Sequence, residues 1–470
     1  MRTDLAVIGA GPAGLAATLA AAARGLRVAL LDAAPAPGGQ YLRQPAADLA
    51  ARRPPGPHRP HRPHRPGRAW RRLRDALAAH VAAGRVTLLM DHHIWAVEPA
   101  FPGFTVHALP GPDEEESVAV RSRALVLATG GYEKVLPFPG WTLPGVVTAG
   151  GAQAMLKGGL VVPGRRAVMA GTGPLLLPVA TGLAAAGTEV AALVESADLR
   201  ALPRHGRALA VKLPEAAGHA ARLLRHRVRL LTGHTVLRAH GEDALTAVTV
   251  AALDRAGRPR PGTERRLACD TLAVGHGMLP HTDLAVSLGC RLAGPAVHVD
   301  DEQRTDVPGV WAAGEATGIG GAALASAEGH IAGRSAAARL RGGEPRAADW
   351  ARAANSRTTH RKFAAALDAV YAPPAHWTER ITDDTVVCRC EEVTAGAVRR
   401  AVTELGAGDA RTVKLLTRAG MGWCQGRMCG PAVAGLAGCE LLPARRPFAC
   451  PVPLGTLARQ HHEPTGEGAP

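Results

Sequence analysis

Four cysteines in the C-terminal part of the chain form two close pairs. Cys388 and Cys390 are separated by one residue, and Cys424 and Cys429, which follow 33 residues further on, are separated by four. Four thiolates in two close pairs suit either a tetrahedral zinc ion or a [2Fe–2S] cluster. Zinc sites usually take their pairs as Cys-x-x-Cys, and neither pair has that spacing. We therefore expect metal ligands here, with zinc as the alternative to an iron–sulfur cluster.

The residues beside these thiols suit a negatively charged cluster. Arg389 and Arg427 can offset its charge. A helix is expected to start just after Cys429, and its positive end then points at the site. Glycines at positions 420, 422, 426 and 430 allow backbone N–H groups to approach the sulfur atoms.

A nucleotide-binding unit opens the chain. Residues 5–9 form an expected buried strand, an Ala/Leu-rich helix runs to residue 24, and a second strand covers residues 28–32. The glycines between the first strand and the helix permit a tight turn, a close approach to a pyrophosphate and close packing of helix on strand. The helix N-terminus attracts phosphates, and an acid after the second strand can bind the ribose. The residues expected to contact the nucleotide are Gly9, Gly11, Pro12, Ala13, Gly14 and Asp32.

Two later segments favour FAD over NAD at this first site. The strand over residues 125–128 ends in Thr129 and Gly130, and residues 305–315 end in Gly314 and Glu315 before a Gly/Ala-rich helix. Here the sequence resembles flavoproteins with two dinucleotide-binding domains. The resemblance implies that the turn at Thr129 and Gly130 closes the FAD domain. It also implies that Glu315, where relatives mostly have Asp, reaches the flavin ribitol. Gly39 and Gln40 match a segment that often follows the ribose acid in these flavoproteins.

A second unit of the same kind begins at residue 166. Gly171 and Gly173 occupy the turn, and Glu195 ends the next strand, where an acid favours NAD over NADP. The third glycine position holds Leu176, whose bulk pushes the helix away from the strand or shifts the phosphates. The fold is expected, but occupancy by NAD(H) or another nucleotide is doubtful.

The other four cysteines indicate no redox pair. Cys269 and Cys290 are too far apart for a Cys-x-x-Cys motif and are expected to be small buried hydrophobic residues. Cys439 and Cys450 fall outside the ligand spacing. Residues 1–150 contain no cysteine, which argues against disulfide reductase chemistry. No catalytic acid, base or nucleophile can be named from the sequence.

The whole chain resembles the α (A) subunit of heteromeric amino-acid and opine dehydrogenases, a group with octopine/nopaline oxidase, hydrogen cyanide synthase and dye-linked proline and hydroxyproline dehydrogenases. Its cysteine region resembles the bacterioferritin-associated ferredoxin-like [2Fe–2S] domain. The resemblance implies a FAD-dependent oxidoreductase acting on CH–NH or CH–NH₂ substrates through a partner flavoprotein β subunit. It also implies a further candidate partner, a small ferredoxin-like subunit. The segments that carry it are 130–141, 171–178, 313–321, 388–394, 422–429 and 451–455.

Two other functions stay open. One is a self-contained NAD(P)H-dependent flavoprotein reductase, and the other is a redox-sensing or nucleic-acid-binding metal module. The net charge of +15 arises from 50 Arg and 5 Lys against 40 acids. We interpret it as a solvated basic surface, so nucleic acid is not an expected partner. Residues 52–68, with their Pro-His-Arg repeat, are expected to be an exposed insertion.

The expected fold class is α/β, with two Rossmann-like domains and a small helical [2Fe–2S] domain. The FAD domain is discontinuous, over residues 1–150 and 270–345, and the second nucleotide fold covers 151–269. A linker over 346–380, the ferredoxin-like domain over 381–445 and a tail over 446–470 complete the chain. No signal peptide or membrane-length apolar run is apparent, so a cytoplasmic location is expected. The sequence names neither the substrate nor the electron acceptor.

Overall fold

A mixed sheet and a parallel sheet form the body of the protein. The structure, a computed structural model, describes residues 1–45, 49, 67–114, 116–443 and 446–460. The first sheet has the order β3-β2-β1-β6-β5-β4, with β19 beside β6. The four inner pairings among β3, β2, β1, β6 and β19 are parallel, and β4 and β5 form an antiparallel meander on the extended β6. The strand bounds are β1 Arg2–Ile8, β2 Val28–Leu31, β3 Val86–Leu89, β4 His92–Pro99, β5 Phe104–Pro110, β6 Val118–Leu127 and β19 Val310–Ala312.

The second sheet is parallel throughout, in the order β11-β10-β9-β15-β8, and an antiparallel sheet β12-β13-β14 lies beside it. Both β9 and β10 are nearly continuous apolar runs, as expected for strands covered on both faces. The bounds are β8 Val146–Thr148, β9 Arg166–Thr172, β10 Glu189–Glu195, β11 Arg229–Thr232, β12 His234–His240, β13 Ala247–Ala252, β14 Arg265–Ala268 and β15 Thr271–His276.

The boundaries between the two folds lie a few residues away from the expected ones, which were 150/151 and 269/270. Strand β8 precedes residue 150 and β15 follows residue 269, yet both belong to the second sheet because they pair with each other and β15 pairs with β9. The chain crosses between the two folds beside them, through the short antiparallel pair β7 Gly131–Glu133 and β16 Met278–Pro280. A sequence motif marks a turn, but it does not tell which sheet a three-residue strand joins.

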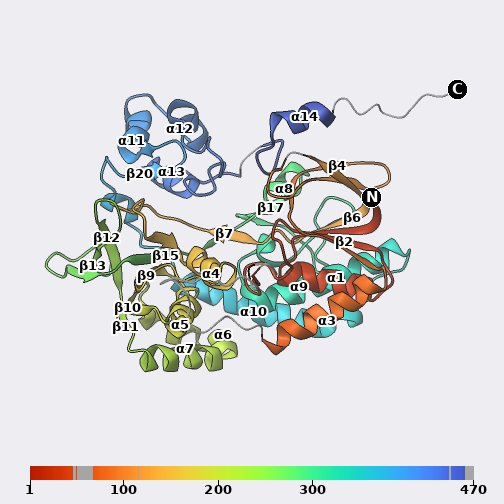
Figure 1. Cartoon of the computed structure of the whole chain (residues 1–470), viewed down its shortest axis with the longest axis horizontal. Helices are drawn as coiled ribbons and strands as arrows, with labels where there is room; N and C mark the ends of the chain where they lie inside the picture. Colours follow the sequence, from red (N-terminus) through yellow and green to blue (C-terminus); the bar gives the residue numbers. More distant parts are fainter. Residues whose placement is uncertain (46–48, 50–66, 115, 444–445, 461–470) are drawn as a thin grey trace.

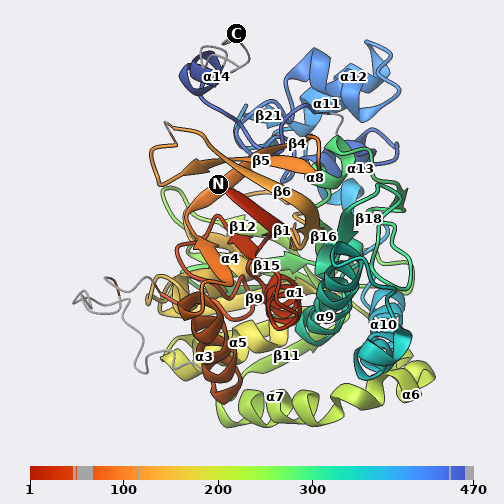
Figure 2. The ribbon, with the colours of Figure 1, turned by 90° about the vertical axis from the view of Figure 1, so that its right-hand side faces the viewer.

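The helices of the body pack mainly on one face of each sheet (Figure 1), and antiparallel strands pack on the other face. On the first fold, α1 Pro12–Ala22 runs beside α9 Gly321–Leu340 (Figure 2). Their approach is close because Gly329 and Gly333 face α1: a Cβ on either would lie 2.0 or 2.3 Å from an α1 carbonyl oxygen. The remaining helices of the body are α3 Arg68–Ala82, α4 Ala149–Lys157, α5 Leu176–Ala186, α6 Gly206–Leu209, α7 Leu213–Arg225, α8 Asp283–Ser287 and α10 Ala351–Val370.

The C-terminal domain has its own apolar core, formed by residues between 377 and 437. Figure 1 shows its helices grouped apart from the two sheets. After the 3₁₀ turn η5 Trp377–Arg380 come β20 Val386–Cys388, β21 Val393–Thr394, α11 Ala395–Thr403, α12 Ala410–Thr417 and α13 Gly430–Leu436. The expected helix after Cys429 is therefore present.

The C-terminal tail packs against the body. Ala449 N–H donates to the carbonyl of Trp95 in β4, and Phe448 packs edge-on against the Trp95 ring. Helix α14 Leu454–Gln460 follows. In the described residues, no helix has the length and apolar character needed to cross a membrane. Most of the Pro-His-Arg segment lies outside the described residues.

Candidate cofactor sites

The first glycine turn has the geometry that nucleotide binding needs. Gly9 has a φ of +103°, and a Cβ there would lie 2.2 Å from the carbonyl oxygen of Ala128. At Gly14 a Cβ would lie 1.7 Å from the Gly9 oxygen, so helix and strand meet only because both residues lack side chains. Helix α1 begins at Pro12 without a side-chain cap. Its first N–H groups therefore remain open to an anion.

Asp32 lies at the end of β2 and is tied to this turn. Its two oxygens accept N–H bonds from Ala10 and Ala34. Burial raises the pKa of this carboxyl above its ordinary value, although both hydrogen bonds oppose the shift. Each oxygen keeps a further lone pair, so the carboxylate can still accept a ribose hydroxyl.

The structure brings the later segments to the same end of the sheet. Gly39, at a φ of +57°, lies so close to Gly11 that a Cβ would be 2.7 Å from the Gly11 Cα. The Thr129 hydroxyl donates to the carbonyl of His281, which fixes the turn at Gly130 to the returning chain. Gln40 is exposed, and its side chain accepts a hydrogen bond from Arg43 instead of pointing into the turn.

Glu315 follows Gly314 at the start of η3 Gly314–Thr317, and burial raises the pKa of its carboxyl. Gly314 has a φ of +76°, and a Cβ there would lie 2.8 Å from the Ala13 side chain. This turn therefore packs directly on the first turn of α1, beside the expected phosphate site. Glu315 therefore lies close to the first turn of α1, and its contact with the flavin ribitol stays a prediction.

A buried carboxylate that the sequence analysis missed holds this turn. Glu328, in the middle of α9, is 1% exposed. It accepts hydrogen bonds from the Gly314 N–H at 2.9 Å and the Thr317 hydroxyl at 2.8 Å, and it pairs with Arg361 of α10 at 2.9 Å. The available signal was an acid inside an otherwise Ala/Gly-rich helix, where a charge needs a partner.

The second glycine turn differs from the first at the helix start. Gly171, at a φ of +132°, packs tightly on Gly275, whereas α5 begins only at Leu176. The N–H groups of Leu176 and Leu177 bond back to residues 173 and 174, so they are not open to a phosphate. Leu176 itself is 1% exposed and packs in the core beneath the turn.

Glu195 is buried rather than presented to a ligand. It is 4% exposed and accepts N–H bonds from Gly173 at 3.1 Å and Ala197 at 2.8 Å. Burial raises its pKa to about 7 despite these bonds. The predicted residues are thus together, but the acid caps its own turn and the helix offers fewer free donors than α1.

The four candidate ligand cysteines meet in two pairs. Cys388 and Cys429 are buried and in hydrogen-bond contact, and Cys390 and Cys424 are in contact nearer the surface. The Gly420 N–H points at the Cys388 sulfur at 3.5 Å, and a Cβ on Gly422 would lie 2.1 Å from that of Cys390. Within the described residues, no three His, Cys, Asp or Glu side chains converge as a preformed ion site.

The two arginines beside the thiols bind the body of the protein. Arg427 forms a double hydrogen bond with Asp283 of α8, and Arg389 lies over the Trp141 ring at 5.4 Å. Their expected role of offsetting cluster charge stays a prediction. A further cation beside the thiols, which the sequence analysis missed, is Arg446, whose guanidinium donates to the carbonyl of Gln425. The contacts of Arg427 and Arg389 dock the cysteine domain against the body of the protein.

Two nucleotide folds in tandem, followed by a thiol-bearing domain, define an oxidoreductase of the two-dinucleotide-domain class. The family described as pyridine nucleotide-disulphide oxidoreductase matches residues 3–329, and the BFD-like [2Fe-2S] binding domain matches residues 386–437. The chain therefore belongs to the pyridine nucleotide-disulphide oxidoreductase family and carries a BFD-like C-terminal domain. It is a FAD-dependent oxidoreductase whose cofactors are FAD and a [2Fe–2S] cluster, and the domain match favours that cluster over zinc.

The relatives cover nearly the whole chain. Hydrogen cyanide synthase subunit HcnB of Pseudomonas aeruginosa is 35% identical over 449 residues, 90% of each chain. The opine oxidase A subunit of Rhizobium meliloti is 35% identical over 448 residues, 92% of each chain. The crystal structure of L-proline dehydrogenase from P. horikoshii shares the fold, with a TM-score of 0.66 and 19% identity over 98% of this chain and 80% of that one. Both sequence relatives are subunits of larger assemblies.

Proposed function

We propose that this chain is the electron-transferring α subunit of a heteromeric dehydrogenase for an amino acid, an opine or a related amine. A partner flavoprotein β subunit oxidises the CH–NH bond, and this chain carries the electrons onward through its own cofactors. The observation that carries the proposal is the docking of the thiol-bearing domain on the FAD fold through Arg427 and Asp283. A relay needs cofactors held at fixed separation, and a pair of partly buried charges provides such a restraint.

The four paired thiols are the proposed cluster ligands. Cys388, Cys390, Cys424 and Cys429 supply the four sulfur donors that a [2Fe–2S] cluster takes. The glycines beside them support this assignment, because side chains at Gly420 or Gly422 would fill the space next to the sulfur atoms. The Gly420 N–H can stabilise a thiolate, and N–H donors of this kind adjust the reduction potential.

The FAD site is proposed at the glycine turn before α1. The open N–H groups of α1 bind the pyrophosphate, Asp32 accepts the ribose hydroxyls, and Gly39 leaves room beside Gly11. Glu315, in the turn that packs on α1, would hold the ribitol. The expected FAD site is completed by Pro12, Ala13, Thr129, Gly130 and Gly314. The exposed side chain of Gln40 contacts Arg43 instead. FAD and the cluster supply the redox chemistry, and the residues of this chain orient and shield them.

The self-contained NAD(P)H reductase is the weaker alternative. Leu176 is buried beneath the second turn, and the Glu195 oxygens already accept two backbone N–H bonds. A dinucleotide would therefore find fewer free N–H donors at the helix start and a ribose acid that is only 4% exposed. A cytoplasmic location agrees with eight free cysteines, because thiols stay reduced there.

Cofactor analysis of anaerobically purified protein tests the proposal. We expect one flavin, two irons and two sulfides per chain. The Cys424→Ser variant should lose iron and sulfide while keeping flavin, and Cys439→Ser, at a cysteine outside the pairs, should keep all three. Equal cluster content in both variants would refute the ligand assignment.

The source of the electrons that reduce the flavin distinguishes the α-subunit function from the NAD(P)H reductase. Mixing with NADH should leave the flavin oxidised, whereas co-expression with a flavoprotein encoded beside this chain, followed by addition of its amine substrate, should reduce it. Rapid bleaching by NADH alone would establish the reductase instead.

A further inference from the structure

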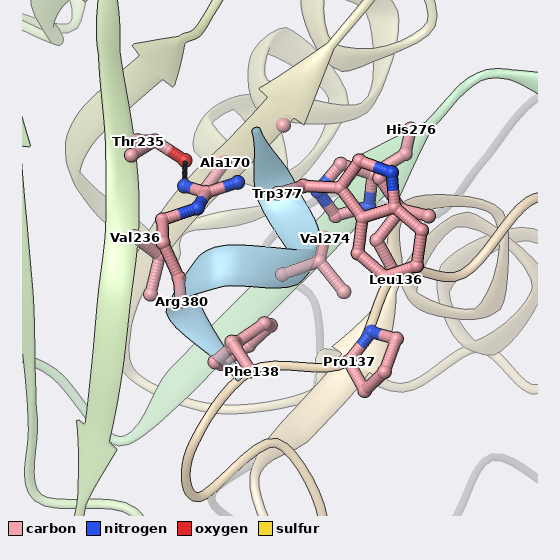
Figure 3. Close-up of a pocket in the computed structure, with 11 residues that line it drawn as sticks. Leu136, Pro137, Phe138, Ala170, Thr235, Val236, Val274, His276, Trp377 and Arg380 are labelled. Atoms are coloured by element: carbon pink, nitrogen blue, oxygen red, sulfur yellow. Dashed lines mark hydrogen bonds between the residues drawn. The ribbon is translucent and has the colours of Figure 1, made fainter. Parts of the chain in front are cut away.

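A small pocket lies between the second nucleotide fold and the start of the cysteine domain (Figure 3). Its apolar side includes Leu136, Phe138 and Val236, and Trp377 of η5 closes it. The polar lining consists of Thr235, His276 and Arg380. The pocket is thus built from three parts of the chain. Gly171 of the second glycine turn also lines it, whereas no residue of the glycine turn before α1 and none of the four paired thiols does.

Arg380 brings an unbalanced positive charge into this pocket. One guanidinium nitrogen donates to the Thr235 hydroxyl at 2.6 Å, as Figure 3 shows, while the buried Nε has no partner. Burial alone lowers the pKa of Arg380 to about 10, and no carboxylate among the described residues opposes that shift. The side chain therefore remains charged near neutral pH. The Arg380 side chain is partly exposed, but its buried Nε has lost water and gained no partner, which is costly.

His276 adds a second unsatisfied group. Its Nδ1 is buried and has no hydrogen-bond partner. Burial, with the charges of Arg380 and Lys134, lowers the pKa of His276 to about 3, so the imidazole is neutral. A neutral imidazole still donates one N–H. Both charged groups that act on His276 are cations, so the pocket is positive overall.

We propose that this pocket binds a small monovalent anion, a halide or a short carboxylate, between Arg380 and His276. The cavity volume of about 20 Å³ exceeds the ~10–15 Å³ that a single water needs on this measure. A halide or a carboxylate head fits such a space, and a nucleotide does not. The anion satisfies the free Nε of Arg380 and accepts the His276 N–H.

The bound anion also joins two units. Arg380 ends η5, directly before the cysteine domain, while His276 and Thr235 belong to the second nucleotide fold. Neutralising Arg380 in place holds η5 against that fold. Anion binding therefore raises the thermal stability of the junction and leaves the flavin site unchanged.

Thermal unfolding of the cofactor-loaded protein tests the binding. Potassium chloride or potassium acetate replaces potassium gluconate at constant ionic strength, because gluconate is too large for the pocket. We expect a saturable rise in the unfolding midpoint, lost in Arg380→Gln and shifted to higher anion concentration in Thr235→Val. The matched control is Arg258→Gln, which removes an ion pair with Glu379 of the same η5 without touching the pocket.

Crystals grown with bromide locate the anion directly. An anomalous peak between Arg380 and His276, weakened by acetate but not by gluconate, supports the proposal and shows that carboxylates share the site. A peak that acetate leaves intact assigns the site to halides. No peak in the pocket, or a midpoint rise that is equal in Arg380→Gln, overturns the proposal. Stabilisation by ADP that depends on Arg380, without any halide or acetate effect, also overturns it and assigns the arginine to the second nucleotide fold.

Discussion

Glu328→Ala should loosen the turn that places Glu315 beside the flavin. The substitution leaves the buried Gly314 N–H without an acceptor, which destabilises by about 1–3 kcal/mol. The Thr317 hydroxyl keeps a second acceptor, the Gly314 carbonyl at 2.8 Å. Arg361 has a 44% exposed side chain and stays hydrated, so its lost ion pair adds little. We expect a total loss of about 2–3 kcal/mol.

Thermal unfolding and flavin content measure this effect. At ~2–4 °C per kcal/mol for domains of this size, the midpoint should fall by several degrees. Flavin per chain after gel filtration should fall as well, because Gly314 packs on the first turn of α1. Glu328→Gln keeps an oxygen for the Gly314 N–H and should lose less than half as much stability.

The matched control is Glu302→Ala. Glu302 also binds α9, through Ser335 and Arg339, but it lies away from the Gly314 turn. This variant should keep its flavin even where the midpoint falls. A Glu328→Ala protein with full flavin content and an unchanged midpoint would refute the reasoning, since a buried N–H would then have lost its acceptor without consequence.

Three further predictions concern buried or close contacts. Burial raises the folded-state pKa of Glu195 from an ordinary 4.5 to about 7, so between these pH values the folded state binds more protons than the unfolded state. The contribution of Glu195 to the free energy of unfolding is therefore fully present below pH 4.5, and it falls by about 3 kcal/mol as the pH rises to 7. Glu195→Gln should flatten that stretch of a urea-unfolding profile, and an unchanged slope would argue against it. Arg427→Gln should weaken domain docking and speed proteolysis before residue 386, whereas the exposed Arg418→Gln should not; equal cleavage rates would exclude the docking role. Gly329→Ala should destabilise the protein by ~1–3 kcal/mol, because its Cβ would lie 2.0 Å from a carbonyl oxygen of α1. Gly182→Ala, whose Cβ would lie 3.7 Å from the nearest atom, should be neutral or stabilising, and calorimetry measures both variants.

Short-range patterns in the sequence were sufficient to recognise the cofactor motifs. The turn from Gly9 to Gly14 could be predicted because positive φ angles and close backbone contacts there exclude side chains. The two cysteine pairs could be recognised from their spacing, but the contacts in the structure join Cys388 to Cys429 and Cys390 to Cys424, which depends on the fold of the segment between them. The helices after both motifs follow from local composition.

The groups that hold these motifs in place were decided by tertiary structure. Arg427 reaches Asp283 across 144 residues, and Arg380 reaches Thr235 across 145. Glu328 is joined to the Gly314 turn only through the packing of α9. Arg427 was read as a partner of the cluster because it adjoins Cys424 and Cys429 in sequence, yet the docking of the domain directs it elsewhere. The sequence by itself determined which cofactors this protein binds, because those motifs are local; which charges are buried, and against what, depended on contacts between distant segments that no local pattern encodes.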